Sequence, residues 1–309
     1  MMMKNKKYLI INADDFGMSS EFNQAICSLM TQGIVSSTSL MANGRAYEEA
    51  IRSICKLDLR NIGVHLTLTC DGFENNNKIT YSSVSHANSI EDKNGLLFCS
   101  YRDLAVNASD EDIINEIYSQ IIKIKNDGIE FTHIDNHMYS VIHYLGLRGY
   151  KCFYKALHRL KIDREIGFRH ALKKTDIDGV RSVYPGRKIQ PYAWAMNFIF
   201  HLRCPDYVFT IPYASPQSES VEQKCDLLNT LFSNIKNGVS ELHVHPAVYS
   251  EELRKRNPTW KDRINEYEAL KCYSKNLLKN KYGITLISYA DLVKVPMSIF
   301  TRLQNLVSL

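Results

Sequence analysis

The sequence predicts an α/β fold in which about seven parallel strands alternate with helices, as a distorted or incomplete (β/α) barrel. Short apolar runs that read as strands recur between longer amphipathic segments that read as helices, which is the order typical of parallel sheets. Acidic and histidine residues follow directly after several of these runs. The count of about seven strands alternating with helices favours a barrel over an open, doubly wound sheet. In such barrels catalytic groups lie at the carboxyl ends of strands.

The first strand is the apolar run at 8–11, which leads to Asp14 and Asp15 before the turn-permissive Gly17. A serine at position 19 or 20 can cap the helix that follows, and this helix ends at Gly33. Strands are expected next at 35–41 and 61–69, with a helix at 46–57 between them. This order is the βαβα pattern of a parallel sheet.

A polar stretch at about 71–110 interrupts the alternation, and connections of this length are usually functional insertions or lids. The elements expected after it are a helix at 109–127, a strand at 131–134, a helix at 144–160 and a strand at 168–172. The region 173–205 reads as irregular. Its aromatic run at 192–200 is more typical of a core-packed helix than of a substrate-facing wall.

The last third of the chain predicts strands at 207–211, 240–244 and 285–288, with helices at 220–235 and 262–278. No internal repeat or linker is evident, so we expect residues 1–309 to form a single domain with an insertion at about 71–110. The amphipathic stretch after Pro296 can pack on this domain or on a second subunit, which leaves a homodimer open.

Composition excludes several classes of protein. The net charge of +5 is small and the basic residues are scattered, so no nucleic-acid partner is expected. The eight cysteines form no Cys-x-x-Cys pair, which favours free thiols in a reducing compartment. The apolar run at 8–11 is too short for a signal peptide, and no stretch reaches the ~18 apolar residues of a membrane span. We expect a cytoplasmic protein without a membrane partner.

A metal site is the chemistry that the polar residues at the strand ends favour. Two adjacent aspartates after a buried strand are costly unless a cation or a shared proton offsets their charge. Singly, each downstream residue has an ordinary explanation, such as a helix cap or a half-buried histidine. Together, an aspartate and histidines from separate strands form the open three-ligand set of a catalytic metal site. The candidates are Asp14, Asp15, His65, His133, Asp135, His137, Arg169, His243 and His245.

The segments 12–17, 63–66, 132–137 and 241–246 together resemble the YdjC-like (ChbG-type) carbohydrate deacetylases. They occur in the order of that family and span most of the chain. The resemblance implies a distorted barrel related to the polysaccharide deacetylases. It also implies an enzyme that uses one divalent metal ion, magnesium or zinc, to hydrolyse the acetamide of an N-acetylated amino sugar. The substrate would be a monosaccharide or an oligosaccharide of the chito-oligosaccharide kind, and acetate would be released.

Carried over to this sequence, the resemblance makes Asp15, His65 and His137 the metal ligands. Asp14 corresponds to the general base and His245 to the general acid. The chemistry suits these residue types, because a metal polarises the amide carbonyl and lowers the pKa of bound water while an aspartate takes a proton from that water. A protonated His245 would then give a proton to the departing sugar amine.

Four further residues belong to the same motifs or strand ends. Arg169 is similar to an arginine that orients the base or contacts substrate. Strand alternation should turn His133 and Asp135 to the same side as His137, where a carboxylate can fix the tautomer of a ligating histidine. His243 shares the side of His245 and competes with it for the role of acid; the following proline favours His245.

The sequence departs from the family pattern at 138–141, where members often carry further histidines, and at Ala247, where glycine is usual after His-Pro. The sugar specificity of relatives is therefore not carried over. Two other functions remain open. A barrel-type metal phosphoesterase normally needs more metal-binding carboxylates and a basic rim. A non-catalytic carbohydrate-binding barrel would be signalled by replacement of Asp14 or His245, and both are present.

Overall fold

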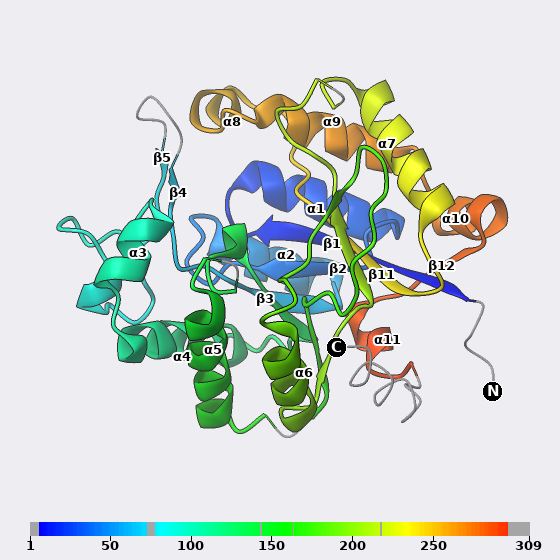
Figure 1. The fold of residues 1–309 in the computed structure, drawn as a ribbon. Coiled ribbons are helices and arrows are strands. Elements are labelled where there is room, and N and C mark those ends of the chain that lie inside the picture. Colours follow the sequence, from blue (N-terminus) through cyan, green and yellow to red (C-terminus); the bar gives the residue numbers. More distant parts are fainter. Residues whose placement is uncertain (1–5, 73–77, 143, 163, 217, 296–309) are drawn as a thin grey trace.

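The computed structural model describes residues 6–72, 78–142, 144–162, 164–216 and 218–295. Its centre is a curled sheet in which seven parallel strands are hydrogen-bonded in the order β10-β11-β1-β2-β3-β6-β7 (Figure 1). This confirms the predicted fold class. The strands are β1 (Lys7–Phe16), β2 (Ser37–Leu40), β3 (Ile62–Leu66), β6 (His133–Asn136), β7 (Ile166–Phe168), β10 (Tyr207–Thr210) and β11 (Gly238–Val244).

Three short strands complete this sheet. β8 (Arg181–Ser182) runs antiparallel to β10 at one edge, and β9 (Leu202–Arg203) runs parallel to β7 at the other. β12 (Ile284–Leu286) pairs with the first residues of β1, beside the part of β1 that pairs with β2. Within the described ranges no strand pairing joins the β8 and β9 edges, so the barrel is incomplete.

Helices cover the outside of the curled sheet (Figure 1). Their apolar faces form the core with the strands; α4, for example, buries a stripe of isoleucines that includes Ile113, Ile117 and Ile121. The helices are α1 (Ser20–Gln32), α2 (Tyr47–Leu57), α4 (Asp110–Asn126), α5 (Gly146–Leu160), α6 (Gln190–Ile199), α7 (Val221–Asn234), α8 (Glu251–Arg256), α9 (Trp260–Lys271), α10 (Lys275–Tyr282) and α11 (Tyr289–Leu292).

The predicted insertion contains the antiparallel pair β4 (Asp71–Gly72) and β5 (Lys78–Ile79), the 3-10 turn η2 (Asn88–Ile90) and α3 (Tyr101–Asn107). In Figure 1 the β4–β5 pair and α3 lie at one end of the molecule. The insertion is fastened to α4 through the buried Glu116. Its carboxylate accepts hydrogen bonds from the backbone N–H groups of Val84 and Ser85 and from the Ser85 hydroxyl.

The predicted helix at 262–278 is two helices, α9 and α10. The break occurs because the Ser274 hydroxyl accepts a hydrogen bond from the backbone N–H of Leu277 at 3.2 Å and so starts a new helix. The apolar periodicity continues across this cap, and for that reason the sequence pattern alone does not show the interruption.

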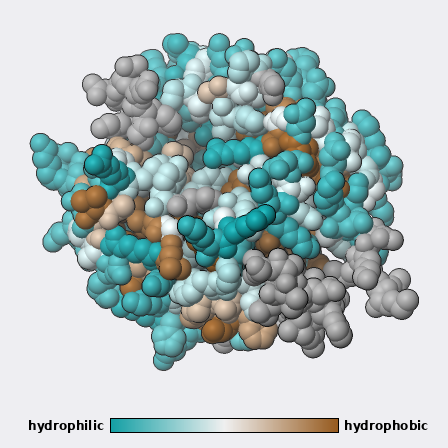
Figure 2. Space-filling model, viewed as in Figure 1, coloured by the Kyte–Doolittle hydropathy of each residue, from teal (hydrophilic) through white to brown (hydrophobic). Residues whose placement is uncertain are grey.

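The aromatic run at 192–200 forms α6, which buries one side only. Ala193 and Asn197 are buried, whereas Phe198 and Ile199 are 57% and 60% exposed. On the face seen in Figure 2, hydrophobic residues occur as small groups separated by hydrophilic ones. In the described part of the chain, no helix is both long enough and apolar enough to cross a membrane.

Gly63 permits a close approach between β3 and β6. A Cβ atom at this position would lie 2.4 Å from the imidazole ring of His133. That ring is fully buried and stacks on Tyr289, with 4.0 Å between ring centroids, so it has no room to move away. Packing in the inner part of the sheet therefore depends on glycine at this site.

We expect Gly63→Ala to lower the free energy of unfolding by about 1–3 kcal/mol, because the added methyl group overpacks the core. In a His133→Ala background the same substitution should be nearly neutral, since the clashing ring is gone. Urea unfolding of the wild type, both single variants and the double variant measures this coupling. An equal cost of Gly63→Ala in both backgrounds would show that the His133 contact is not the cause.

Candidate active site

The end of β1 brings two neighbouring carboxylates into one site. Successive side chains of a regular strand point to opposite faces, which would separate Asp14 from Asp15. The register between β1 and β2 shifts between Ala13 and Phe16, and Asp15 adopts a left-handed backbone with φ 66°. Like a β-bulge, this irregularity changes the directions of the side chains, so that Asp14 and Asp15 need not point to opposite faces. Both carboxylates are buried, and each lies close to histidines.

Arg169, just after β7, binds three carboxylates from three strands. Its guanidinium donates to both oxygens of Asp14 at 2.6 Å, and it lies 2.8 Å from Asp135 and 2.7 Å from Glu241. Burial alone would raise the pKa of Asp14, but the charge of Arg169 outweighs it and holds that pKa well below its usual range. Asp14 is therefore an anion. Burial raises the pKa of Glu241 to about 7, although Arg169 opposes this shift.

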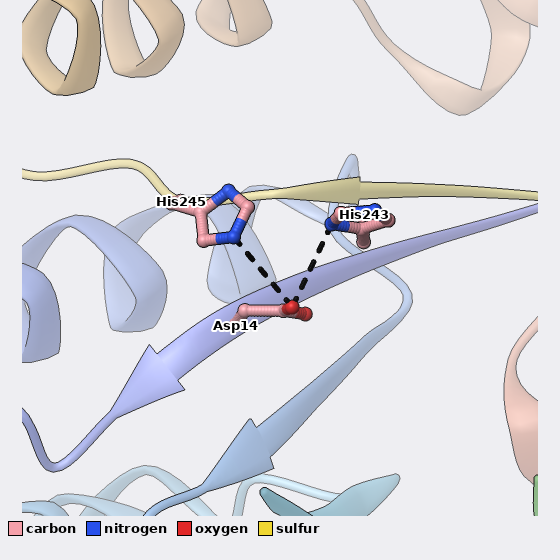
Figure 3. A group of neighbouring side chains, drawn as sticks. All are labelled: Asp14, His243 and His245. Carbon is pink, nitrogen blue, oxygen red and sulfur yellow. Dashed lines mark ion pairs between the residues drawn. The ribbon is translucent and has the colours of Figure 1, made fainter. Parts of the chain in front are cut away.

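Asp14 also faces two histidines of β11 and its end (Figure 3). Its Oδ2 atom lies 3.6 Å from Nδ1 of His243 and 3.7 Å from Nε2 of His245. The other ring nitrogens are held by tyrosines: Nε2 of His243 is hydrogen-bonded to the Tyr139 hydroxyl at 2.9 Å, and Nδ1 of His245 to that of Tyr213. The His245 side chain is 15% exposed and that of His243 only 4%.

Glu266 and Tyr213 fix the position of His245. The Glu266 carboxylate accepts hydrogen bonds from the His245 backbone N–H at 2.7 Å and from the Tyr213 hydroxyl at 3.2 Å. Burial and the positive charge of Arg263 lower the pKa of His245 to about 3. Burial and the neighbouring arginine therefore disfavour a charged imidazole at His245.

The second cluster is formed by Asp15, His65 and His137, all buried. One oxygen of Asp15 lies 3.3 Å from Nε2 of His65 and 3.0 Å from Nδ1 of His137. The remaining nitrogen of each ring meets a carboxylate: Asp135 is 2.6 Å from Nδ1 of His65, and Asp71 is 2.5 Å from Nε2 of His137. Histidines that ligate metal ions are commonly oriented by carboxylates in this way.

This cluster fits a divalent metal ion. Nitrogen and oxygen ligand atoms of Asp15, His65 and His137 lie within 4.8 Å of one another. Burial disfavours charged imidazoles, yet Asp135 raises the pKa of His65 to about 9 and Asp71 raises that of His137 to about 10. The neighbouring carboxylates thus favour positive charge at the cluster. This donor set suits zinc, magnesium or manganese.

Of the predicted site residues, His133 lies apart from the two histidine clusters. The structure stacks its ring on Tyr289 and places it against Gly63, and its Nε2 atom has no hydrogen-bond partner among the described residues. Asp135 instead lies between His65 and Arg169, beside a candidate ligand as expected.

Sequence reasoning missed Asp71, Glu241, Tyr213 and Arg263. Asp71 carries a usable signal, because it follows the third predicted strand as Asp14 follows the first. Glu241 stands within a recognised motif but near the start of the predicted strand at 240–244 rather than after its end. Tyr213 and Arg263 come from a loop and from a helix, where no strand-end pattern points to them.

Comparison with known proteins identifies the family. The family described as "YdjC-like protein" matches residues 8–274. The chain belongs to the YdjC-like family. A protein of Listeria innocua named carbohydrate deacetylase 1 is 26% identical over 289 residues, which cover 92% of this chain and 99% of that protein. The carbohydrate deacetylase of Thermoanaerobacter pseudethanolicus is 26% identical over 277 residues, 89% of this chain and 92% of the relative.

A solved structure supports the fold of this YdjC-like chain. The crystal structure of a putative cellobiose-phosphate cleavage protein from Enterococcus faecalis superimposes with a TM-score of 0.70, and covers 93% of this chain and 99% of that one. The two sequences are 23% identical. The match of the family over residues 8–274 confirms the family resemblance that the four motifs suggested.

Asp71→Asn should weaken binding of a divalent metal by about 10–100-fold, because His137 loses the carboxylate that orients it. Zn²⁺ titration against a competing chelator measures the affinity. Asp103→Asn, an exposed change in α3 of the same insertion, is the matched control and should leave the affinity unchanged. Equal affinities for all three proteins would contradict the role of Asp71.

Proposed function

We propose that this protein is a metal-dependent hydrolase that removes the N-acetyl group from an N-acetylated amino sugar and releases acetate. Residues 1–309 would act as one catalytic domain. The names of the curated relatives support the class of substrate, a carbohydrate with an acetyl group. A monosaccharide or a chito-oligosaccharide is the proposed form of that carbohydrate.

The observation that carries the proposal is the pairing of two buried clusters. An anionic Asp14 faces His243 and His245, and directly beside it the Asp15 cluster offers three converging ligand atoms. Amide hydrolysis needs a base for the attacking water, an acid for the departing amine and stabilisation of the charge that develops on the carbonyl oxygen. The two clusters together supply groups for all three tasks.

Asp15, His65 and His137 are the proposed ligands of one divalent ion, with magnesium or zinc as the proposed metal. When bound, the ion would polarise the acetamide carbonyl and favour ionisation of water. Asp135 and Asp71 would keep the two imidazoles oriented. Asp135 contacts Nδ1 of His65 and Asp71 contacts Nε2 of His137, and in each ring the other nitrogen is the one near Asp15.

Asp14 is the proposed general base. Arg169 holds it as an anion and fixes its plane through two hydrogen bonds, so one carboxylate oxygen is kept near the histidines of β11. As water attacks the carbonyl carbon, its proton would pass to Asp14. The same Oδ2 atom lies 3.7 Å from Nε2 of His245, so that this proton can be handed on to the neutral imidazole.

His245 is the proposed general acid. Once it has received the proton, the imidazolium would protonate the sugar nitrogen as the C–N bond breaks, which restores an anionic Asp14 and a neutral His245. Its greater exposure favours it over His243, whose ring is enclosed and held by Tyr139. Tyr213 and Glu266 would keep Nε2 directed toward Asp14.

Acetate release from a panel of N-acetylglucosamine mono- and oligosaccharides tests the function. We expect no release after chelation and restored release when Mg²⁺ or Zn²⁺ is added back, because the Asp15 cluster is proposed to need the ion. Metal binding without acetate release from any member of the panel would contradict the proposed substrate class.

Asp14→Asn should retain the metal and lower kcat about 10²–10⁴-fold, which is the usual contribution of a general base. The amide keeps the shape of the carboxylate but cannot accept the proton of water. Metal content and kcat are measured on the same preparation, so a loss of metal is distinguished from a loss of the base. A variant with near-wild-type turnover would remove Asp14 from this role.

A further inference from the structure

Arg263 is a partly buried cation that no carboxylate of the described residues binds directly. It lies on α9, and its Nε and Nη1 atoms are shielded from solvent and have no hydrogen-bond partner among the described residues. Its guanidinium instead lies over the ring of Tyr213, 4.3 Å from the ring centroid. Polar atoms that are shielded from water are normally hydrogen-bonded, so the missing partner of Nε and Nη1 needs an explanation.

The nearest acidic residue on α9 does not supply the partner. Glu266 is three residues further along, a spacing at which ion pairs are common on helices. Its Oε2 atom is occupied by Tyr213 and by the backbone of His245, and its Oε1 atom has no hydrogen-bond partner among the described residues. Arg263 and Glu266, both described by the structure, therefore do not form an ion pair with each other.

Arg263 lies at the candidate active site. The Tyr213 ring beneath its guanidinium carries the hydroxyl that is bonded to Nδ1 of His245. The backbone carbonyl of Arg263 accepts a hydrogen bond from Ala247, two residues after His245, at 3.2 Å. Through these contacts the cation is anchored to the segment that holds the proposed acid.

We infer that Arg263 binds the acyl oxygen of the substrate and, after cleavage, the carboxylate of acetate. This inference rests on the proposed function. Attack on an acetamide places negative charge on the carbonyl oxygen, and C–N cleavage then leaves acetate, which is an anion with two oxygens. A planar guanidinium whose Nε and Nη1 atoms have no hydrogen-bond partner among the described residues matches a carboxylate in shape and charge. Arg169 is not available for this task, because Asp14, Asp135 and Glu241 already occupy it.

The test measures acetate binding directly, so that it does not depend on turnover. Zinc-loaded protein is titrated with [1-¹³C]acetate and the dissociation constant is obtained from NMR line widths. We expect Arg263→Gln to raise this dissociation constant at least tenfold. Arg263→Lys, which keeps the positive charge but lacks the planar pair of N–H donors, should raise it less. In the deacetylation assay, product inhibition by acetate should weaken in parallel.

Arg203→Gln is the matched control. Arg203 also has shielded, unpartnered Nε and Nη1 atoms, but it lies on the edge strand β9 and pairs with Glu165 at 2.9 Å. Its substitution should leave acetate binding unchanged. Zinc content and thermal unfolding of each variant confirm that the compared proteins are folded and loaded.

The outcomes separate this inference from the proposed function. A wild-type protein that releases no acetate from any sugar refutes the function. If the wild type deacetylates sugars but Arg263→Gln binds acetate as tightly as before, the inference alone is wrong, even when turnover falls. If Arg263→Gln instead loses binding of N-acetylglucosamine 6-phosphate while acetate binding persists, Arg263 binds the phosphate group of the sugar. The inference that it binds the acyl oxygen is then wrong.

Discussion

The guanidinium of Arg169 is the interaction on which the site depends. It lies almost wholly buried and meets carboxylates from β1, β6 and β11, so it ties together strands that are not all neighbours in the sheet. Buried charges are costly when any partner is missing. The arginine and its carboxylates therefore have to be present together, and the ends of these strands are held in one arrangement as a result.

The same network joins the two clusters. Asp135 contacts Arg169 with one oxygen and His65 with the other, and Asn12 donates hydrogen bonds to both Asp14 and Asp135. Asp135 and Arg169 thus connect His65 of the Asp15 cluster to Asp14, the carboxylate that faces His245. Electrostatic coupling of this kind is strong in an enclosed site, where water does not screen the charges.

How far the sequence predicts this site depends on where each residue lies. Asp14, His65 and His137 stand within or shortly after predicted strands, and parallel strands bring their carboxyl ends to one rim, so their meeting is predictable. The bulge that turns Asp14 and Asp15 into the same site is not, because it depends on the register of β1 against β2 rather than on residue type. For His133 the sequence pattern was misleading. Its motif suggested a position near the metal ligands, but its ring packs in the core between Gly63 and the ring of Tyr289.

Long-range contacts account for the remaining differences. Tyr213 comes from a loop and Glu266 from a helix, and they meet only because α9 packs near the end of β11. Asp71 belongs to the insertion, yet it contacts His137 from 66 residues away. Neither relation leaves a periodic pattern in the chain.

The position of Asp71 limits how this fold can change its specificity. Insertions after strands are natural units for exchange between relatives, since they vary while the sheet stays constant. Here the first residue of the insertion holds His137, and Tyr81, just beyond β5, packs its ring edge-on to the same imidazole and donates a hydrogen bond to Asp71 at 3.4 Å. A chimaera that replaces the whole segment would exchange part of the metal centre with it, whereas one joined after Tyr81 would graft a new rim onto an intact centre.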